Sequence, residues 1–154
     1  GKIVFYSGII DNLKLTDAEI AAIMGHEMAH ALREHSREKL SRSMATGGVI
    51  SIASAAFGLS AGQAQVAQLA GDVGLSLPHS RTQESEADKI GLELMARAGY
   101  NPNAAVSLWQ KMQAKSGSSG PQFLSTHPSS SNRIKQIQDL LPAVMPLYNA
   151  SNKK

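Results

Sequence analysis

The pattern His26-Glu27-x-x-His30 is the feature that most constrains the fold, because it requires a helix at this point of the chain. Residues four positions apart lie on one face of an α-helix, so the two imidazoles can direct ring nitrogens at a common point. Residues 16–19, with the sequence TDAE, form a capping-box pattern that marks the start of such a helix. We therefore predict one long helix from this box to residues 42–44, with the histidines on a largely apolar, buried part.

Two neutral histidines on one helical face are a common pair of zinc ligands. Glu27 lies one residue round the helix from His26, which holds its carboxylate beside a bound metal, where it can accept a proton from a water molecule that the metal activates. The alternative is a solvated helix that happens to carry these residues, but the pattern arises by chance in only about one in a few hundred chains of this length. We predict a site for one Zn²⁺, with Glu27 as general base.

A catalytic zinc needs a third protein ligand, and the composition narrows the choice. The chain contains no cysteine, so the ligand has to be His, Asp or Glu. A helix predicted over residues 81–98 carries three acids: Glu84 and Asp88 share a face with small residues, whereas Glu86 points about 160° away from Asp88. We predict Glu84 as the third ligand, Asp88 as the acceptor of a histidine N–H group and Glu86 as a surface residue; a solvated acid is the alternative for the first two.

Residues 80–91 follow the pattern S-R-x-x-E-x-x-A-D-x-x-G, which together with the histidine motif closely resembles metallopeptidase family 48 among the gluzincins. That family includes the HtpX heat-shock proteases, the prenyl-protein proteases, and the bacterial BepA-like and mitochondrial Oma-like enzymes. The later sequence STHP at residues 125–128, with Arg133, looks like the family's downstream element. The resemblance covers nearly the whole chain, from residue 2 to about residue 141.

The resemblance implies a zinc endopeptidase that holds its metal with His26, His30 and Glu84, with Glu27 as base. It also implies a mainly α fold with a small antiparallel β-sheet (α+β), whose edge receives the substrate as an added strand. The β-forming residues 2–6 are the clear strand signal in the sequence. A non-proteolytic chaperone or assembly module with a structural zinc is the competing function, but structural sites normally have four protein ligands.

The resemblance further implies polypeptide substrates, namely misfolded or misassembled envelope proteins. Integral-membrane members carry full-length spans, whereas the strongly apolar residues 49–59 of this chain are about half the roughly 20 residues that a bilayer requires. The chain therefore looks closest to the BepA-like and Oma-like branch. The implied location is the periplasm or outer membrane of a Gram-negative bacterium, as an exported protein or a lipoprotein.

Two downstream residues have roles that the sequence leaves open. His127 could donate a hydrogen bond to the oxyanion, occupy the fourth zinc position and keep the enzyme latent, or be an ordinary loop residue. Arg133 could support an oxyanion donor or bind substrate. His79 is interpreted as a loop residue and Trp109 as a core residue. His35 lies half a turn round the predicted long helix from His26, so we expect it on the surface.

The remaining sequence bounds the domain organisation and the partners. The length and composition fit a single catalytic domain over residues 1–154, with a poorly ordered tail at 142–154 after a last helix at 130–141, and the start at Gly1 indicates an N-terminally truncated fragment. The net charge of +3 is spread along the helices, which argues against a nucleic-acid partner. Residues 44–77 are predicted to form two small-residue helices, parted near residues 58–62, that serve as a lid or contact a membrane or partner.

Overall fold

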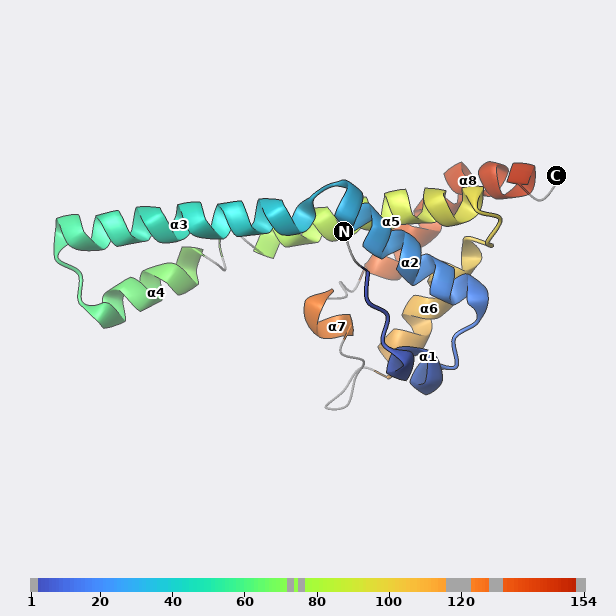
Figure 1. Ribbon diagram of the computed structural model, residues 1–154, viewed down its shortest axis with the longest axis horizontal. Coiled ribbons are helices and arrows are strands. Elements are labelled where there is room, and N and C mark those ends of the chain that lie inside the picture. Colours follow the sequence, from blue (N-terminus) through green and yellow to red (C-terminus); the bar gives the residue numbers. More distant parts are fainter. Residues whose placement is uncertain (1–2, 72–73, 75–76, 116–122, 128–131, 152–154) are drawn as a thin grey trace. The chain divides into compact units, whose positions relative to one another are not determined.

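A computed structural model describes residues 3–71, 74, 77–115, 123–127 and 132–151 of the chain. The chain divides into two compact units, one formed by residues 1–32 with residues 84–154 and the other by residues 33–83 (Figure 1). Each unit is described by itself below. The predicted single catalytic domain is not tested by this division and stays a prediction.

The first unit is a cluster of helices around one apolar core. Its helices are α1 (Ser7–Leu13), α2 (Asp17–Leu32), the part of α5 (Leu77–Arg97) from Glu84 onward, α6 (Asn103–Ala114), α7 (Phe123–Thr126) and α8 (Arg133–Ser151). α6 lies against both α2 and α8. The core side chains come from every long helix of the unit and include Ile23, Leu92, Met95, Leu108, Trp109, Met112, Ile137 and Val144. Trp109 was predicted as core, and it is.

The predicted strand at the N-terminus is wrong, and with it the small antiparallel sheet of the expected α+β fold. Among the described residues, 3–6 have no regular structure and the chain then enters α1. The described parts of the chain offer no second strand, so β-forming side chains alone could not make one. Ile9 and Leu13 instead have the i, i+4 spacing of a helical face, and Leu13 is buried in the core.

The predicted capping box is confirmed, but the long helix that follows it is broken. The Thr16 backbone N–H donates to Glu19 Oε2 at 2.8 Å, and the Glu19 N–H donates back to Thr16 Oγ1 at 3.3 Å. α2 then ends at Leu32, because Glu34 adopts a left-handed conformation with φ of 52°. His35 is buried, with only 4% of its surface exposed, so the surface prediction was wrong. The break changes the helical angle on which that prediction depended.

A pair of glycines lets two ligand-bearing helices of the first unit approach closely. The Cβ atom of an alanine at position 25 would lie 2.6 Å from the Gly91 carbonyl oxygen, and one at position 91 would lie 2.7 Å from the His26 backbone nitrogen. Only glycine fits such a crossing, since neither backbone can give way as a flexible side chain would. The crossing joins α2, immediately before His26, to α5, one turn after Asp88.

The last helix is longer than predicted. α8 begins at Arg133 and passes through Pro142 and Pro146 before ending at Ser151. The predicted end near residue 141 was therefore too early, and residues 142–151 of the expected tail are helical. Each proline removes a backbone hydrogen bond, but Val144 and its apolar neighbours pack on the core and outweigh that loss. Residues 152–154 lie outside the described part of the chain.

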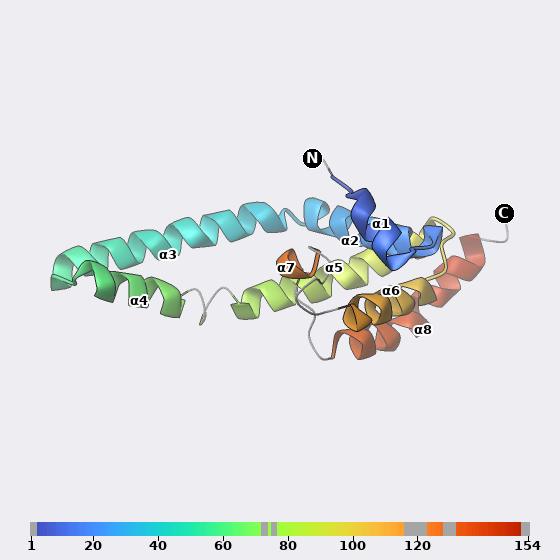
Figure 2. The same cartoon turned by 90° about the horizontal axis from the view of Figure 1, so that it is seen from below.

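The second unit contains α3 (His35–Phe57) and α4 (Ala61–Gly71), which lie side by side in Figures 1 and 2. Gly58 ends α3 in a left-handed conformation with φ of 62°, so the predicted parting of two helices near residues 58–62 is confirmed. Their exposed side chains include many large apolar ones: Leu40, Met44, Val49, Ile52, Phe57, Val66 and Leu69. Within the described residues, none of the helices combines the length and hydrophobicity needed to cross a bilayer.

Candidate metal centre

Four side chains of the first unit converge on one point. His26 and His30 come from α2, Glu84 from α5, and His127 from the residue after α7, and one ligand atom from each lies within 4.8 Å of the others. The predicted trio is tighter: His26 Nε2 is 3.0 Å from His30 Nε2 and 3.4 Å from Glu84 Oε2, and His30 Nε2 is 3.3 Å from Glu84 Oε1. Ligand atoms around a tetrahedral zinc lie about 3.3 Å apart. These distances therefore fit zinc.

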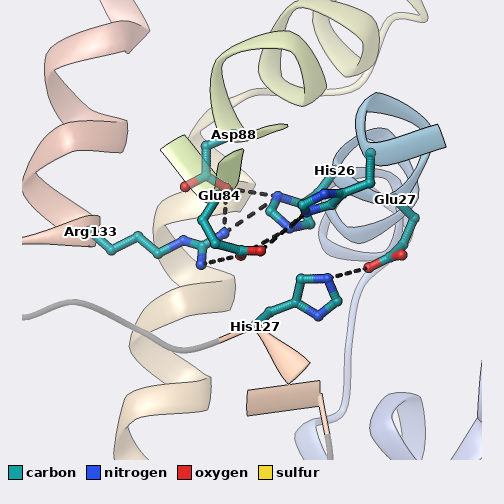
Figure 3. A network of polar contacts seen from close by, with 7 residues as sticks. His26, Glu27, Glu84, Asp88, His127 and Arg133 are labelled. Atoms are coloured by element: carbon teal, nitrogen blue, oxygen red, sulfur yellow. Dashed lines mark hydrogen bonds and ion pairs between the residues drawn. The ribbon is translucent and has the colours of Figure 1, made fainter. Parts of the chain in front are cut away.

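The orientation of His26 is set from behind by Asp88. Figure 3 shows the Asp88 carboxylate in contact with the His26 ring, and Asp88 Oδ1 lies 2.9 Å from His26 Nδ1. An ionised carboxylate can only accept, so His26 donates from Nδ1, and in the neutral ring that binds a metal the lone pair is then on Nε2, which faces the metal position. The structure thus places Asp88 where the sequence placed it, as the acceptor of a histidine N–H group. His26 is 4% exposed, so solvent does not compete for this contact.

Glu84 is buried but remains an anion. Burial alone would raise the pKa of its carboxyl group, but the hydrogen bonds to His26 and His30 and the charge of Arg133 outweigh it, and the pKa is held well below its usual range. Arg133 Nη1 donates to Glu84 Oε2 at 2.9 Å. A deprotonated carboxylate is the form that can bind a metal. By contrast, Glu86 is half-buried and is not part of the converging group.

Glu27 and His127 face each other at the more open side of the site (Figure 3). Their closest atoms, Glu27 Oε1 and His127 Nε2, are 3.4 Å apart, and both side chains are half-buried. Burial lowers the pKa of His127 to about 4, so its ring is neutral at neutral pH. In a neutral imidazole one nitrogen can donate a hydrogen bond and the other can ligate a metal, so the role of Nε2 depends on which nitrogen carries the proton. The geometry therefore brings His127 to the site without choosing between these two roles.

Two aromatic residues near the site were not assigned to it from the sequence. Phe123 stacks on His127 with ring centroids 4.4 Å apart, and the His127 backbone N–H donates to the Phe123 carbonyl at 2.9 Å. Phe123 and His127 are four residues apart in the sequence, and this spacing could have indicated that their rings are neighbours. Trp109 carries the Arg133 guanidinium on its ring, a pairing across helices that no local pattern reveals.

The side chain of His79, predicted as a loop residue, lies outside the described part of the chain.

The comparison with protein families agrees with this geometry. The family model described as Peptidase family M48 matches residues 1–141. The chain belongs to peptidase family M48. M48 peptidases use zinc, and two histidines with a carboxylate are a zinc-binding set, so zinc is the metal that the converging group fits.

Several M48 relatives are similar over nearly all of this chain. The mitochondrial metalloendopeptidase OMA1 of Schizosaccharomyces pombe is 42% identical over 92% of the chain and 42% of its own length. The metalloprotease LoiP of Escherichia coli is 30% identical over 93% of the chain and 56% of its own length. The β-barrel assembly-enhancing protease of Escherichia coli is 26% identical over 99% of the chain and 33% of its own length. The chain therefore spans about half the length of these relatives or less. No solved structure matches it significantly.

Proposed function

We propose that this chain is a zinc-dependent endopeptidase. The observation that carries the proposal is the tetrahedral spacing of His26, His30 and Glu84, with the Glu27 carboxylate beside them and outside that trio. Zinc bound there supplies a Lewis acid that polarises the peptide carbonyl and makes water acidic enough to react at neutral pH. Relatives named as metalloendopeptidases and metalloproteases support the same activity.

The residues of the chain divide the remaining work. Glu27 accepts the proton of the attacking water and delivers it to the leaving amine, because it reaches the open side of the site without being one of the trio of ligands. His127, neutral and opposite Glu27, either donates to the oxyanion or closes the fourth ligand position until substrate displaces it. If it ligates through Nε2, the same nitrogen gives up its contact with Glu27.

Casein digestion by the purified protein tests this function. We expect the wild type to bind zinc, to digest casein, to lose the activity in a chelator and to regain it with added zinc. Glu27→Gln removes the base and keeps the ligands, so it should retain zinc and lose digestion by a factor of about 100 or more. Zinc binding without any digestion by the wild type would support the competing chaperone or assembly function instead.

We also propose that the substrates are misfolded or misassembled envelope proteins, and that the protein works in the periplasm or at the outer membrane of a Gram-negative bacterium. The name of one Escherichia coli relative, the β-barrel assembly-enhancing protease, supports this, while OMA1 relatives are named as mitochondrial. The exposed apolar side chains of α3 and α4, with no charge from residue 43 to residue 71, would serve peripheral membrane contact. Cell fractionation tests the location and the membrane contact, and recovery of the protein from the cytosol would contradict both.

A further inference from the structure

Arg133 connects the last helix of the first unit to both acids of the metal centre. It is the first residue of α8 and only 2% exposed. Its Nη1 donates to Glu84 Oε2 at 2.9 Å, and its Nη2 donates to Asp88 Oδ1 at 2.7 Å (Figure 3). Asp88 Oδ1 also accepts the N–H of His26, so one guanidinium acts on one predicted ligand directly and on a second through an intermediate carboxylate.

The back of the guanidinium is covered by an aromatic ring. Its Cζ atom lies 3.8 Å from the centre of the Trp109 ring, and Trp109 is itself 4% exposed in the core. An arginine held on an aromatic face keeps its planar fork in one orientation, which a lysine ammonium cannot reproduce. A substrate could pair with Arg133 only if Arg133 released the buried carboxylates, so the contacts point to a role inside the site.

We infer that Arg133, held on Trp109, is a positioning residue that orients the zinc ligand Glu84 directly and the zinc ligand His26 through Asp88. The inference rests on the proposed zinc site. It adds that Arg133 holds the ligands in their metal-binding orientation in the zinc-free protein. Glu84 has two carboxylate oxygens and a flexible side chain, so without the fork it can rotate away from the histidines. Buried Asp88 would likewise lose one of its two donors.

Removing Arg133 should change the zinc affinity in opposite directions if the residue acts through its charge and if it positions the ligands, which makes the inference testable. A cation close to the metal repels Zn²⁺, so at a pH where Glu84 stays ionised without Arg133, removing an arginine that acted through charge alone would tighten zinc binding. If it positions the ligands, its removal weakens zinc binding despite the relief of repulsion. Loss of an outer hydrogen-bonding partner of metal ligands typically weakens binding about 10- to 100-fold.

Zinc affinity, measured by competition with a chromophoric chelator, tests the inference in the purified chain. We expect Arg133→Met to bind zinc about 10- to 100-fold more weakly and to give an altered visible spectrum when loaded with Co²⁺. Arg133→Lys keeps the buried charge but not the fork, so it should bind more weakly than wild type, less so than Arg133→Met. Arg133→Lys also keeps the test decisive if Arg133→Met fails to fold. Trp109→Phe keeps a ring under the guanidinium and should stay within a few-fold of wild type.

Lys111→Met is the matched control. Lys111 Nζ lies 2.6 Å from Glu19 Oε2 in the same unit, and Glu19 is buried, so this change also removes the cationic partner of a buried carboxylate. It should lower the melting temperature and leave zinc affinity and the Co²⁺ spectrum unchanged. Wild-type or tighter zinc binding by Arg133→Met or Arg133→Lys would overturn the inference, and unchanged zinc affinity with a raised KM would assign Arg133 to substrate. A wild type that binds no zinc would instead refute the proposed function.

Discussion

Replacing Gly91 with alanine is the sharpest test of how the fold positions the metal ligands. The new Cβ would lie 2.7 Å from the His26 backbone nitrogen and 3.0 Å from the His26 Cα atom, whereas ordinary contact begins at 3.4 Å. The His26 backbone would therefore have to recede by about 0.7 Å, the difference between 3.4 and 2.7 Å. Metal sites tolerate ligand distances within only about 0.2 Å of ideal.

Two measurements should respond to this displacement. Zinc affinity should fall by a factor of about 10 or more, because His26 moves relative to Glu84 on the opposing helix. The free energy of unfolding of the zinc-free protein, from urea denaturation, should also fall, because overpacking usually costs about 1–3 kcal/mol. The gain of about 0.5–1 kcal/mol from replacing a helical glycine offsets only part of this cost.

Gly48→Ala is the control for the glycine replacement itself. Gly48 lies within α3, is exposed, and a Cβ atom there would meet no heavy atom within 4 Å. This variant should keep wild-type zinc affinity and gain about 0.5–1 kcal/mol of stability from helix propensity. If Gly91→Ala behaved like Gly48→Ala in both assays, the close crossing of α2 and α5 would not control the ligand geometry, and the reasoning would be refuted.

Three further substitutions test individual roles. Glu84→Ala should weaken zinc binding more than about 100-fold, because it removes one of the three ligands. Glu86→Ala should bind zinc as wild type does, because Glu86 lies outside the converging group. Atomic absorption after dialysis checks both variants, and the reverse result would refute the prediction that the ligand face of α5 is the one with Glu84. His127→Ala separates the two roles that the geometry allows. Casein digestion should rise if His127 closes the fourth ligand position, and it should fall about 10- to 1,000-fold if His127 donates to the oxyanion. Unchanged digestion would show that His127 has neither role.

The helices that carry the site were predictable because each has a local signal. Three local patterns supply these signals: the capping box at Thr16, the paired histidines one turn apart, and the shared face of Glu84 and Asp88. The members of each pattern are only three or four residues apart, so helical spacing alone predicts their geometry. Gly99 is a similar case. The helix was predicted to end at residue 98, α5 ends at Arg97, and Gly99 just beyond that end has a φ of 85°, a conformation that favours glycine.

The errors arose where distant or non-local contacts decide the structure. A strand at residues 3–6 needs a partner that the described chain does not supply, and local β-propensity carries no information about that partner. The break before His35 depends on a left-handed Glu34, which no glycine or proline announces. Arg133 contacts Glu84 and Asp88 on α5 and Trp109 on α6, three stretches of the chain that are far apart in the sequence, so only the folded chain reveals these contacts.

The break between α2 and α3 has a mechanical consequence. α3 contains 23 residues and so is about 34 Å long. Had the two helices been continuous, α3 would have acted as a stiff lever, and a load at its far end would have twisted the turn that bears His30. The left-handed Glu34 interrupts the series of backbone hydrogen bonds between α2 and α3, so the two helices are not one continuous rod. A bend in α3 is therefore not passed along one continuous helix to the turn that bears His30.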